Sequence, residues 1–134
     1  MHTLQRGITL VGLLIAVAII VLLVTVAVPV YRDYSVSTEV RELVRATDSA
    51  RITLAQGMQR DGSWSPSWVS AIRIAPSGYV ARAGIDAATG TIIVSGTAPT
   101  AGSIITMTPR MVGGRKLEWT CSGTPQRYMP SNCR

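Results

Sequence analysis

An early segment of the chain is apolar almost without interruption. No charged residue occurs between Gly7 and Tyr31, and only two threonines and one glycine interrupt the apolar run from Ile8 to Pro29. A helix over residues 8–31 would be about 36 Å long, because each residue adds ~1.5 Å, and it would cross a ~30 Å hydrocarbon core. The pattern therefore predicts a transmembrane helix. It disfavours a cleaved secretion signal, whose apolar core spans only ~7 to 15 residues.

Beyond Tyr31 the apolar residues fall on one side of a predicted helix. Their spacing alternates between four and three residues, which is typical of an amphipathic helix that packs on another element rather than standing free in water. The stripe consists of Val36, Val40, Leu43, Thr47, Ala50 and Leu54. We expect this helix to run from about Tyr31 to Gln56 and to stop at Gly57. Glu42–Arg45 and Asp48–Arg51 are favourable charge pairs at i, i+3.

The rest of the chain predicts a small antiparallel sheet. Short apolar runs alternate there with turn residues, and most of the glycines and prolines belong to this part. The candidate strands cover residues 79–85, 91–95, 103–108 and 116–121. Turn-rich segments at 86–90 and 109–115 join them in pairs, whereas 69–74 fits either a short helix or a strand. Four antiparallel strands covered by one helix face give an α+β fold.

Composition agrees with this division of the chain. The sequence has 134 residues, which suits a single domain. Only 15% of the residues are charged, whereas about 25% is usual for a soluble domain. The positive mean hydropathy of +0.30 comes from the one apolar segment. We therefore interpret the chain as a membrane-anchored protein with one globular domain.

Three groups of residues resemble the type IV pilin and pseudopilin family. The first is Arg6-Gly7 followed by Ile8-Thr9-Leu10-Val11. The second, at the end of the apolar helix, is Pro29-Val30-Tyr31-Arg32-Asp33-Tyr34. The third resembles the disulfide-bounded loop of type IVa major pilins and comprises Trp119-Thr-Cys121 and Tyr128-Met-Pro130-Ser-Asn-Cys133-Arg134. The middle of the chain matches the family in layout only.

The resemblance implies a fold and a division of the chain into parts. In the pilin fold a long N-terminal helix packs on a four-stranded antiparallel sheet. Residues 1–7 would form a short prepilin leader, and residues 8–31 a helix that serves first as membrane anchor and then as filament core. Residues 32–57 would continue as the amphipathic helix. Residues 58–134 would form a globular β head with a C-terminal disulfide loop.

The resemblance also implies a maturation path and a set of partners. A prepilin peptidase would cut between Gly7 and Ile8 and methylate the new amine of Ile8. The subunit would then leave the inner membrane of a Gram-negative bacterium, with the help of an assembly platform in that membrane, and join a helical homopolymer on the cell surface. Such a pilus would serve adhesion, twitching motility or DNA uptake, in contact with DNA or with a host or abiotic surface.

Gly12 departs from the family pattern. The family usually has a glutamate at this fifth position after the cut, thought to pair with the N-terminal ammonium of a neighbouring subunit, and an ammonium buried without a partner is costly. One interpretation is a major pilin whose amine meets backbone carbonyls instead. The alternative is a minor or tip pilin, or a pseudopilin of a type II secretion or DNA-uptake system. The C-terminal loop favours the major pilin.

Pro29 is expected to kink the apolar helix. A proline inside a helix removes one backbone hydrogen bond and clashes with the preceding turn. The resemblance implies in addition that the stretch before Pro29 loses helicity on assembly. The family often has a glycine in the middle of the span that helps this change, but the residue here is Val21, so we expect a smaller effect.

Cys121 and Cys133 are expected to form a disulfide, because they are an even pair in an exported domain. Closing a loop of roughly 13 residues contributes about 3 kcal/mol in the chain-entropy model. Reduced thiols and a metal site are both disfavoured. Two cysteines without a histidine in the mature chain cannot supply four zinc ligands, and we expect neither a metal nor a cofactor.

Catalysis is not expected either. The one histidine, His2, lies in the predicted leader, so the mature chain lacks the commonest general base. The motifs G-x-S-x-G and H-E-x-x-H are absent from the sequence. We therefore predict a structural protein rather than an enzyme.

Basic residues gather toward the C-terminus of a chain with a formal net charge of +6. They are Arg110, Arg115, Lys116, Arg127 and Arg134. Only Glu118 opposes them, and Trp119 and Tyr128 lie nearby in the sequence. Such residues fit contacts with a DNA backbone, for which Arg110, Arg115, Lys116 and Arg127 are the candidates. A solvated basic surface is the favoured interpretation, because nothing in the sequence fixes these side chains on one face.

Overall fold

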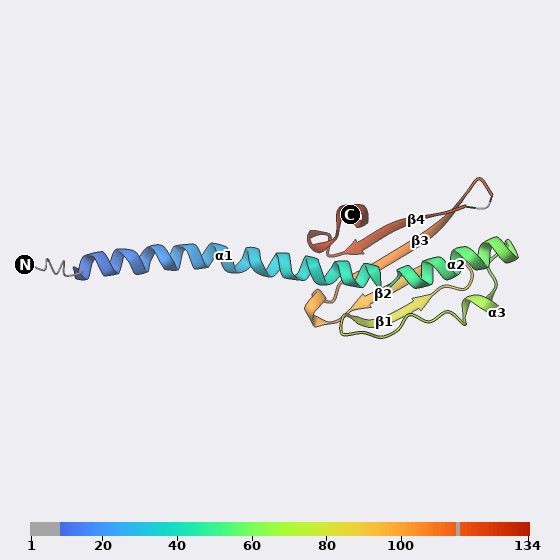
Figure 1. Cartoon of the computed structure of the whole chain (residues 1–134), viewed down its shortest axis with the longest axis horizontal. Coiled ribbons are helices and arrows are strands. Elements are labelled where there is room, and N and C mark those ends of the chain that lie inside the picture. Colours follow the sequence, from blue (N-terminus) through green and yellow to red (C-terminus); the bar gives the residue numbers. More distant parts are fainter. Residues whose placement is uncertain (1–8, 115) are drawn as a thin grey trace, which may run out of the picture. The chain divides into compact units, whose positions relative to one another are not determined.

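The chain adopts an α+β fold in a computed structural model that describes residues 9–114 and 116–134. A helical N-terminal part precedes a four-stranded antiparallel sheet (Figure 1). The chain forms two compact units, and the boundary between them falls after Asp33, inside the first helix. The predicted fold class is confirmed.

Helix α1 spans Leu10–Arg45 and supplies the regular structure of the described part of the first unit. Thr9 caps it, because the Thr9 hydroxyl oxygen accepts a hydrogen bond of 3.2 Å from the Gly12 amide. The Leu13 amide donates to the Thr9 carbonyl at 3.1 Å and closes the first turn. The helix continues through Pro29 without interruption.

The helix predicted to end at Gly57 has different bounds. Helix α1 ends at Arg45, and α2 spans Asp48–Asp61 after a turn at residues 46–47. At this turn the Thr47 amide and hydroxyl both donate to the carbonyl of Val44, three residues back, at 3.0 and 2.7 Å. A threonine hydroxyl that bonds the preceding turn competes with the regular helical pattern. The long N-terminal helical segment is confirmed, but it contains this turn and ends at Asp61 instead of stopping at Gly57.

Gly57 lies inside α2 rather than at its end. The helix stops at Gly62, which has the left-handed φ of 73° and donates its amide to the Met58 carbonyl at 2.8 Å. Gly57 serves a packing role instead, because the ring of Trp68 lies against its Cα. A glycine can thus mark a close approach of two elements as well as a helix end.

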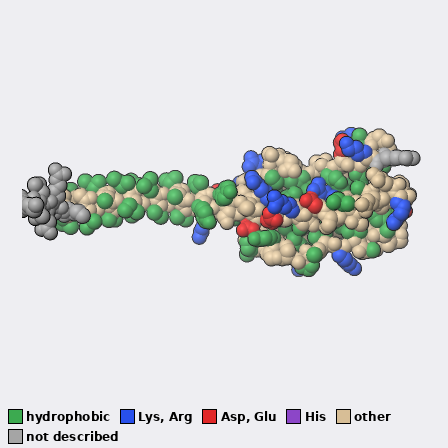
Figure 2. All heavy atoms as spheres, in the orientation of Figure 1, with side chains coloured by type: hydrophobic (Ala, Val, Ile, Leu, Met, Phe, Trp, Pro, Cys, Tyr) green, Lys and Arg blue, Asp and Glu red, His purple; other side chains and the backbone are tan. Residues whose placement is uncertain are grey.

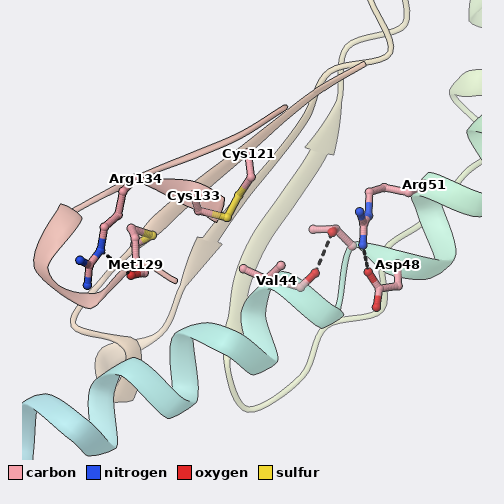
Figure 3. The surroundings of a disulfide bond; sticks show 8 residues. Val44, Asp48, Arg51, Cys121, Met129, Cys133 and Arg134 are labelled. Atoms are coloured by element: carbon pink, nitrogen blue, oxygen red, sulfur yellow. Dashed lines mark hydrogen bonds and ion pairs between the residues drawn. A yellow bond between two sulfur atoms is a disulfide. The ribbon is translucent and has the colours of Figure 1, made fainter. Parts of the chain in front are cut away.

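The apolar stripe of the two helices is buried as predicted. Val40, Leu43, Thr47 and Leu54 are fully buried and Ala50 is 1% exposed, whereas Val36 is half-buried. Both predicted charge pairs are present. The Arg45 guanidinium lies 2.7 Å from Glu42, and Arg51 pairs with Asp48 (Figure 3).

The sheet contains four strands in the order β1-β2-β3-β4, each antiparallel to the next. They span Val80–Ile85 (β1), Ile92–Gly96 (β2), Ile104–Val112 (β3) and Lys116–Thr124 (β4). All four predicted strands are confirmed, but β3 and β4 are longer than expected. Pro109 does not end β3, because β2 pairs with β3 only as far as Met107 and no β2 partner needs an amide from Pro109.

The segment between α2 and β1 contains little regular structure. Helix α3 covers only Pro66–Val69, with Ser65 as its N-cap. Residues 70–79 form neither helix nor strand, so the element predicted over 69–74 is wrong. Val69 is nevertheless fully buried, which ties this segment to the core.

One core holds the second unit together. The inward-facing positions of β2 and β3 alternate with exposed ones, and Cys121 on β4 continues the same layer. These strand residues join the helix stripe in one hydrophobic cluster. Its strand members are Val80, Ile92, Val94, Ile105, Met107 and Cys121.

We predict that Gly57→Ala destabilises the protein although alanine favours helices. The added Cβ would lie 2.6 Å from Cη2 of Trp68, and overpacking typically costs about 1–3 kcal/mol. Thermal unfolding of the purified full chain in detergent should show a lower Tm. The control Gln59→Ala changes an exposed position of the same helix and should leave the Tm unchanged or raise it slightly.

Candidate functional site

The first candidate surface is the apolar part of α1. Every described residue from Thr9 to Arg32 is exposed, and Figure 2 shows the apolar side chains along this part of the helix. The most apolar window has a mean hydropathy of 3.2, and none of it is buried. The 21 residues from Leu10 to Val30 extend about 32 Å as a helix, which is enough to cross the ~30 Å hydrocarbon core of a bilayer.

The polar groups of this segment are satisfied within the helix itself. The Thr25 hydroxyl donates to the Leu22 carbonyl at 2.7 Å. The Thr9 hydroxyl oxygen accepts from Gly12. An apolar solvent offers no hydrogen-bond partners, so a segment that satisfies its own groups can lie in lipid or among equally apolar neighbours.

The start of α1 carries no acidic residue in its first turn. Gly12 occupies the position where the resemblance implied a glutamate, and its amide is satisfied by Thr9. The residues predicted for processing, Gly7 and Ile8, lie outside the described part of the chain. The chemistry of their cleavage therefore stays a prediction, as does the kink at Pro29.

The second candidate surface is a loop closed by a disulfide between Cys121 and Cys133 (Figure 3). Cys121 lies on β4 and Cys133 in the short 3-10 helix Ser131–Cys133, with 4.5 Å between their Cα atoms. Cys133 is fully buried and Cys121 is 9% exposed. The bridge therefore fixes the end of the chain against the sheet instead of crossing open solvent.

Two further contacts hold this loop. The Met129 side chain is 1% exposed and lies so close to Gly123 on β4 that a Cβ there would be 3.2 Å from the Met129 Cε. The Arg134 guanidinium donates from Nε to the Met129 carbonyl at 3.0 Å. Sequence reasoning did not identify Met129 as a core residue. An apolar residue inside an otherwise polar loop was the one available signal.

The predicted basic residues do not form one cluster. Arg110 and Lys116 lie near the β3–β4 turn, where Arg110 is paired in register with Glu118. Arg127 lies beyond the other end of β4 and stacks over the Tyr128 ring at 4.7 Å. The nine residues of β4 put about 27 Å between these ends, because a strand rises ~3.4 Å per residue. Arg115 lies outside the described residues.

The shifted pKa values belong to exposed groups with local partners. The Ala88 amide and the Thr89 hydroxyl donate to the Asp86 carboxylate, each at 2.9 Å, and lower its pKa. A hydrogen bond to Glu39 raises the pKa of Tyr79. The Arg60 guanidinium lowers the pKa of Asp61 through a hydrogen bond of 2.8 Å. The Asp86 contacts lie within a turn and the Arg60–Asp61 contact lies on α2. The Tyr79–Glu39 contact joins the segment before β1 to α1.

The described residues contain no group of three or more His, Cys, Asp or Glu side chains that could hold a metal ion. Both cysteines form the disulfide, so neither is a free thiol. The two prominent features of this part of the chain are an uncovered apolar helix and a covalently closed loop. Both are suited to association and packing.

Comparisons with known proteins give one family and several relatives. The profile of the pilin family, described as a bacterial filament family, matches residues 36–134. The type IV major fimbrial protein FimA of Dichelobacter nodosus is 44% identical over 59 residues, which are 44% of this chain and 37% of FimA. The type IV major pilin protein PilE1 of Neisseria gonorrhoeae is 34% identical over 71 residues, which are 53% of this chain and 43% of PilE1.

The match covers only part of the length of each relative. The chain spans about two fifths of the length of these curated proteins. No solved structure matches the chain.

We predict that replacing both cysteines by serine lowers the free energy of unfolding by about 3 kcal/mol, the value of the chain-entropy model for a loop of this length. Urea unfolding of the full chain in detergent would measure the loss. The same loss should follow when the unchanged protein is treated with a reductant. If reduction leaves the urea midpoint in place, the bridge does not carry the stability of the loop.

Proposed function

Because this chain belongs to the pilin family of bacterial filament proteins, we propose that it is the structural subunit of a type IV pilus. The observation that carries this proposal is the helix segment from Leu10 to Val30, which is apolar on all sides and wholly exposed. A soluble protein would not leave such a surface uncovered. Polymerisation of many copies provides a cover for it.

The same segment suits two environments in succession. Before assembly its length matches a bilayer. After assembly the equivalent segments of neighbouring subunits would replace the lipid, because side chains such as Leu, Ile and Val are as apolar as lipid tails. The subunit would thus be membrane-anchored first and part of a surface filament afterwards.

Maturation would begin at the N-terminus. A prepilin peptidase would cut between Gly7 and Ile8 and methylate the Ile8 amine, and an assembly platform in the inner membrane would pass the subunit into the fibre. The lack of a side chain at Gly7 would allow the peptidase to approach the backbone closely. This path fits a Gram-negative cell, because there the inner membrane that holds the subunit before assembly is separate from the cell surface that carries the fibre.

The major subunit is favoured over a tip pilin or a pseudopilin. FimA and PilE1 are both named as major proteins of their filaments. Gly12 is compatible with this role, because Thr9 caps the helix without an acidic side chain. The N-terminal ammonium of a neighbour would then be met by carbonyl oxygens rather than by a carboxylate.

The first experiment tests processing and assembly together. A bulky substitution, Gly7→Trp, should leave the protein unprocessed in the membrane and abolish surface fibres. Mass spectrometry of sheared fibres from the unchanged strain should show Ile8 as a methylated N-terminus. The control Gly78→Trp places the same side chain where an added Cβ meets nothing within 4 Å, and it should be processed normally. Abundant unchanged protein that never enters fibres would contradict the proposal.

Adhesion, twitching motility and DNA uptake are the roles that such a fibre would serve. For DNA, the charges near the β3–β4 turn provide a test. If they bind duplex DNA, Arg115→Ala with Lys116→Ala should weaken a gel shift and lower the salt slope by about 2, because each lost phosphate contact removes ~0.9. The control Arg60→Ala removes a cation paired with Asp61 on α2. If the double variant and the control bind DNA as tightly as the unchanged protein, these residues do not contact DNA and form only a solvated basic surface.

A further inference from the structure

Strand β1 leaves one edge of the sheet unpaired. It lies at the outside of the strand order and pairs with β2 alone. Figure 1 shows the segment that follows α3 running alongside this edge. The two together line a groove of about 640 Å³. Residues 72–76 form one wall of the groove and residues 80–85 the other.

The backbone of β1 presents open hydrogen-bonding groups to this groove. The Asp86 amide donates to the Thr91 carbonyl at 2.9 Å. Antiparallel pairs alternate between hydrogen-bonded and non-bonded, so Gly84 and Arg82 face β2, and Ala83 and Ile85 direct their N–H and C=O groups away from it. Within the described chain, no backbone hydrogen bond joins residues 70–78 to these outward groups.

The groove has room for one more strand. Ala83 pairs with Val94, which is fully buried, yet Ala83 itself is exposed. A Cβ added to Gly84 would meet nothing within 4 Å. Small side chains along the strand allow another backbone to reach the ~4.8 Å distance of a paired strand. A register shift between Val80 and Arg82 confines regular pairing to residues 82–85.

The charges of the groove select the kind of segment that fits. Arg73 and Arg82 are the charged residues among those that line it, one on each wall, and no aspartate or glutamate is among them. Neither arginine forms an ion pair with another described residue. An extended segment with acidic side chains would therefore complement both walls.

We propose that this groove binds an extended acidic segment of a partner protein, which adds to the sheet as a fifth strand beside Ala83 and Ile85. Main-chain hydrogen bonds would supply the affinity, and the two arginines would supply the selectivity for acidic side chains. This inference goes beyond the pilus role and does not depend on it, since the groove lies wholly within the head.

The test uses the full chain in detergent micelles and an acetylated hexapeptide of alternating Asp and Val. Isothermal titration should show saturable binding, and hydrogen exchange at the Ala83 and Ile85 amides should slow when the peptide is added. A peptide with Lys in place of Asp should bind at least tenfold more weakly. A peptide N-methylated at alternate residues should also lose binding, because it cannot form the main-chain ladder. Equal binding of the N-methylated peptide would overturn strand addition.

Variants of the protein separate the backbone from the charges. Ala83→Pro removes one outward amide that does not serve β2 and should weaken binding about tenfold, the loss expected for one good hydrogen bond. The double variant Arg73→Glu with Arg82→Glu keeps every backbone amide of the groove. It should bind the Lys peptide more tightly than the Asp peptide, the reverse of the unchanged protein. The control Arg110→Glu, outside the groove, should change neither. If the charge-reversed protein binds the Asp peptide as tightly as the unchanged protein does, the proposal is overturned.

A second copy of the chain is the competing occupant. If Ala83 and Ile85 become protected as the protein concentration rises without peptide, the β1 edges pair with each other and the acidic-partner proposal fails. Concentration-independent exchange at these amides is the expected result.

Discussion

The burial of one apolar stripe against the inner face of the sheet supports everything else in the head. Val40, Leu43 and Leu54 are fully buried in one cluster with the strand residues Ile92 and Ile105. A short four-stranded sheet cannot shield its own apolar face from water, and helices laid across it remove that surface. The Thr47 hydroxyl fits the same layer because it bonds the Val44 carbonyl instead of water.

The helical part of the chain changes its surroundings without changing its secondary structure. Helix α1 is exposed throughout the apolar segment, whereas Val40 and Leu43 near its end are buried. No other described residue covers the first stretch, and a bilayer or other subunits would provide that cover. Pilins are structural filament proteins rather than enzymes, and the described residues fit that role through packing and the disulfide.

Periodicity and residue type were sufficient to predict the fold class, the helix stripe, the four strands and the disulfide pair. They failed where long-range geometry decides. Gly57 was taken as a helix end because nothing local indicates that Trp68 packs on it. Pro109 is a turn residue by type and so predicts a break, but β3 continues through it because β2 pairs with β3 only as far as Met107. The groove beside β1 depends on the path of residues 70–78, which no periodicity reveals, and the separation of the basic residues depends on the length of β4.

The Cys121–Cys133 bridge also sets an order of events for the molecule. Disulfides persist in oxidising compartments and are kept reduced in the cytosol. In a subunit anchored as proposed, the loop that buries Met129 would therefore be closed only after the head has left the cytosol. The redox state of the bridge thus distinguishes a newly exported subunit from one whose head is finished.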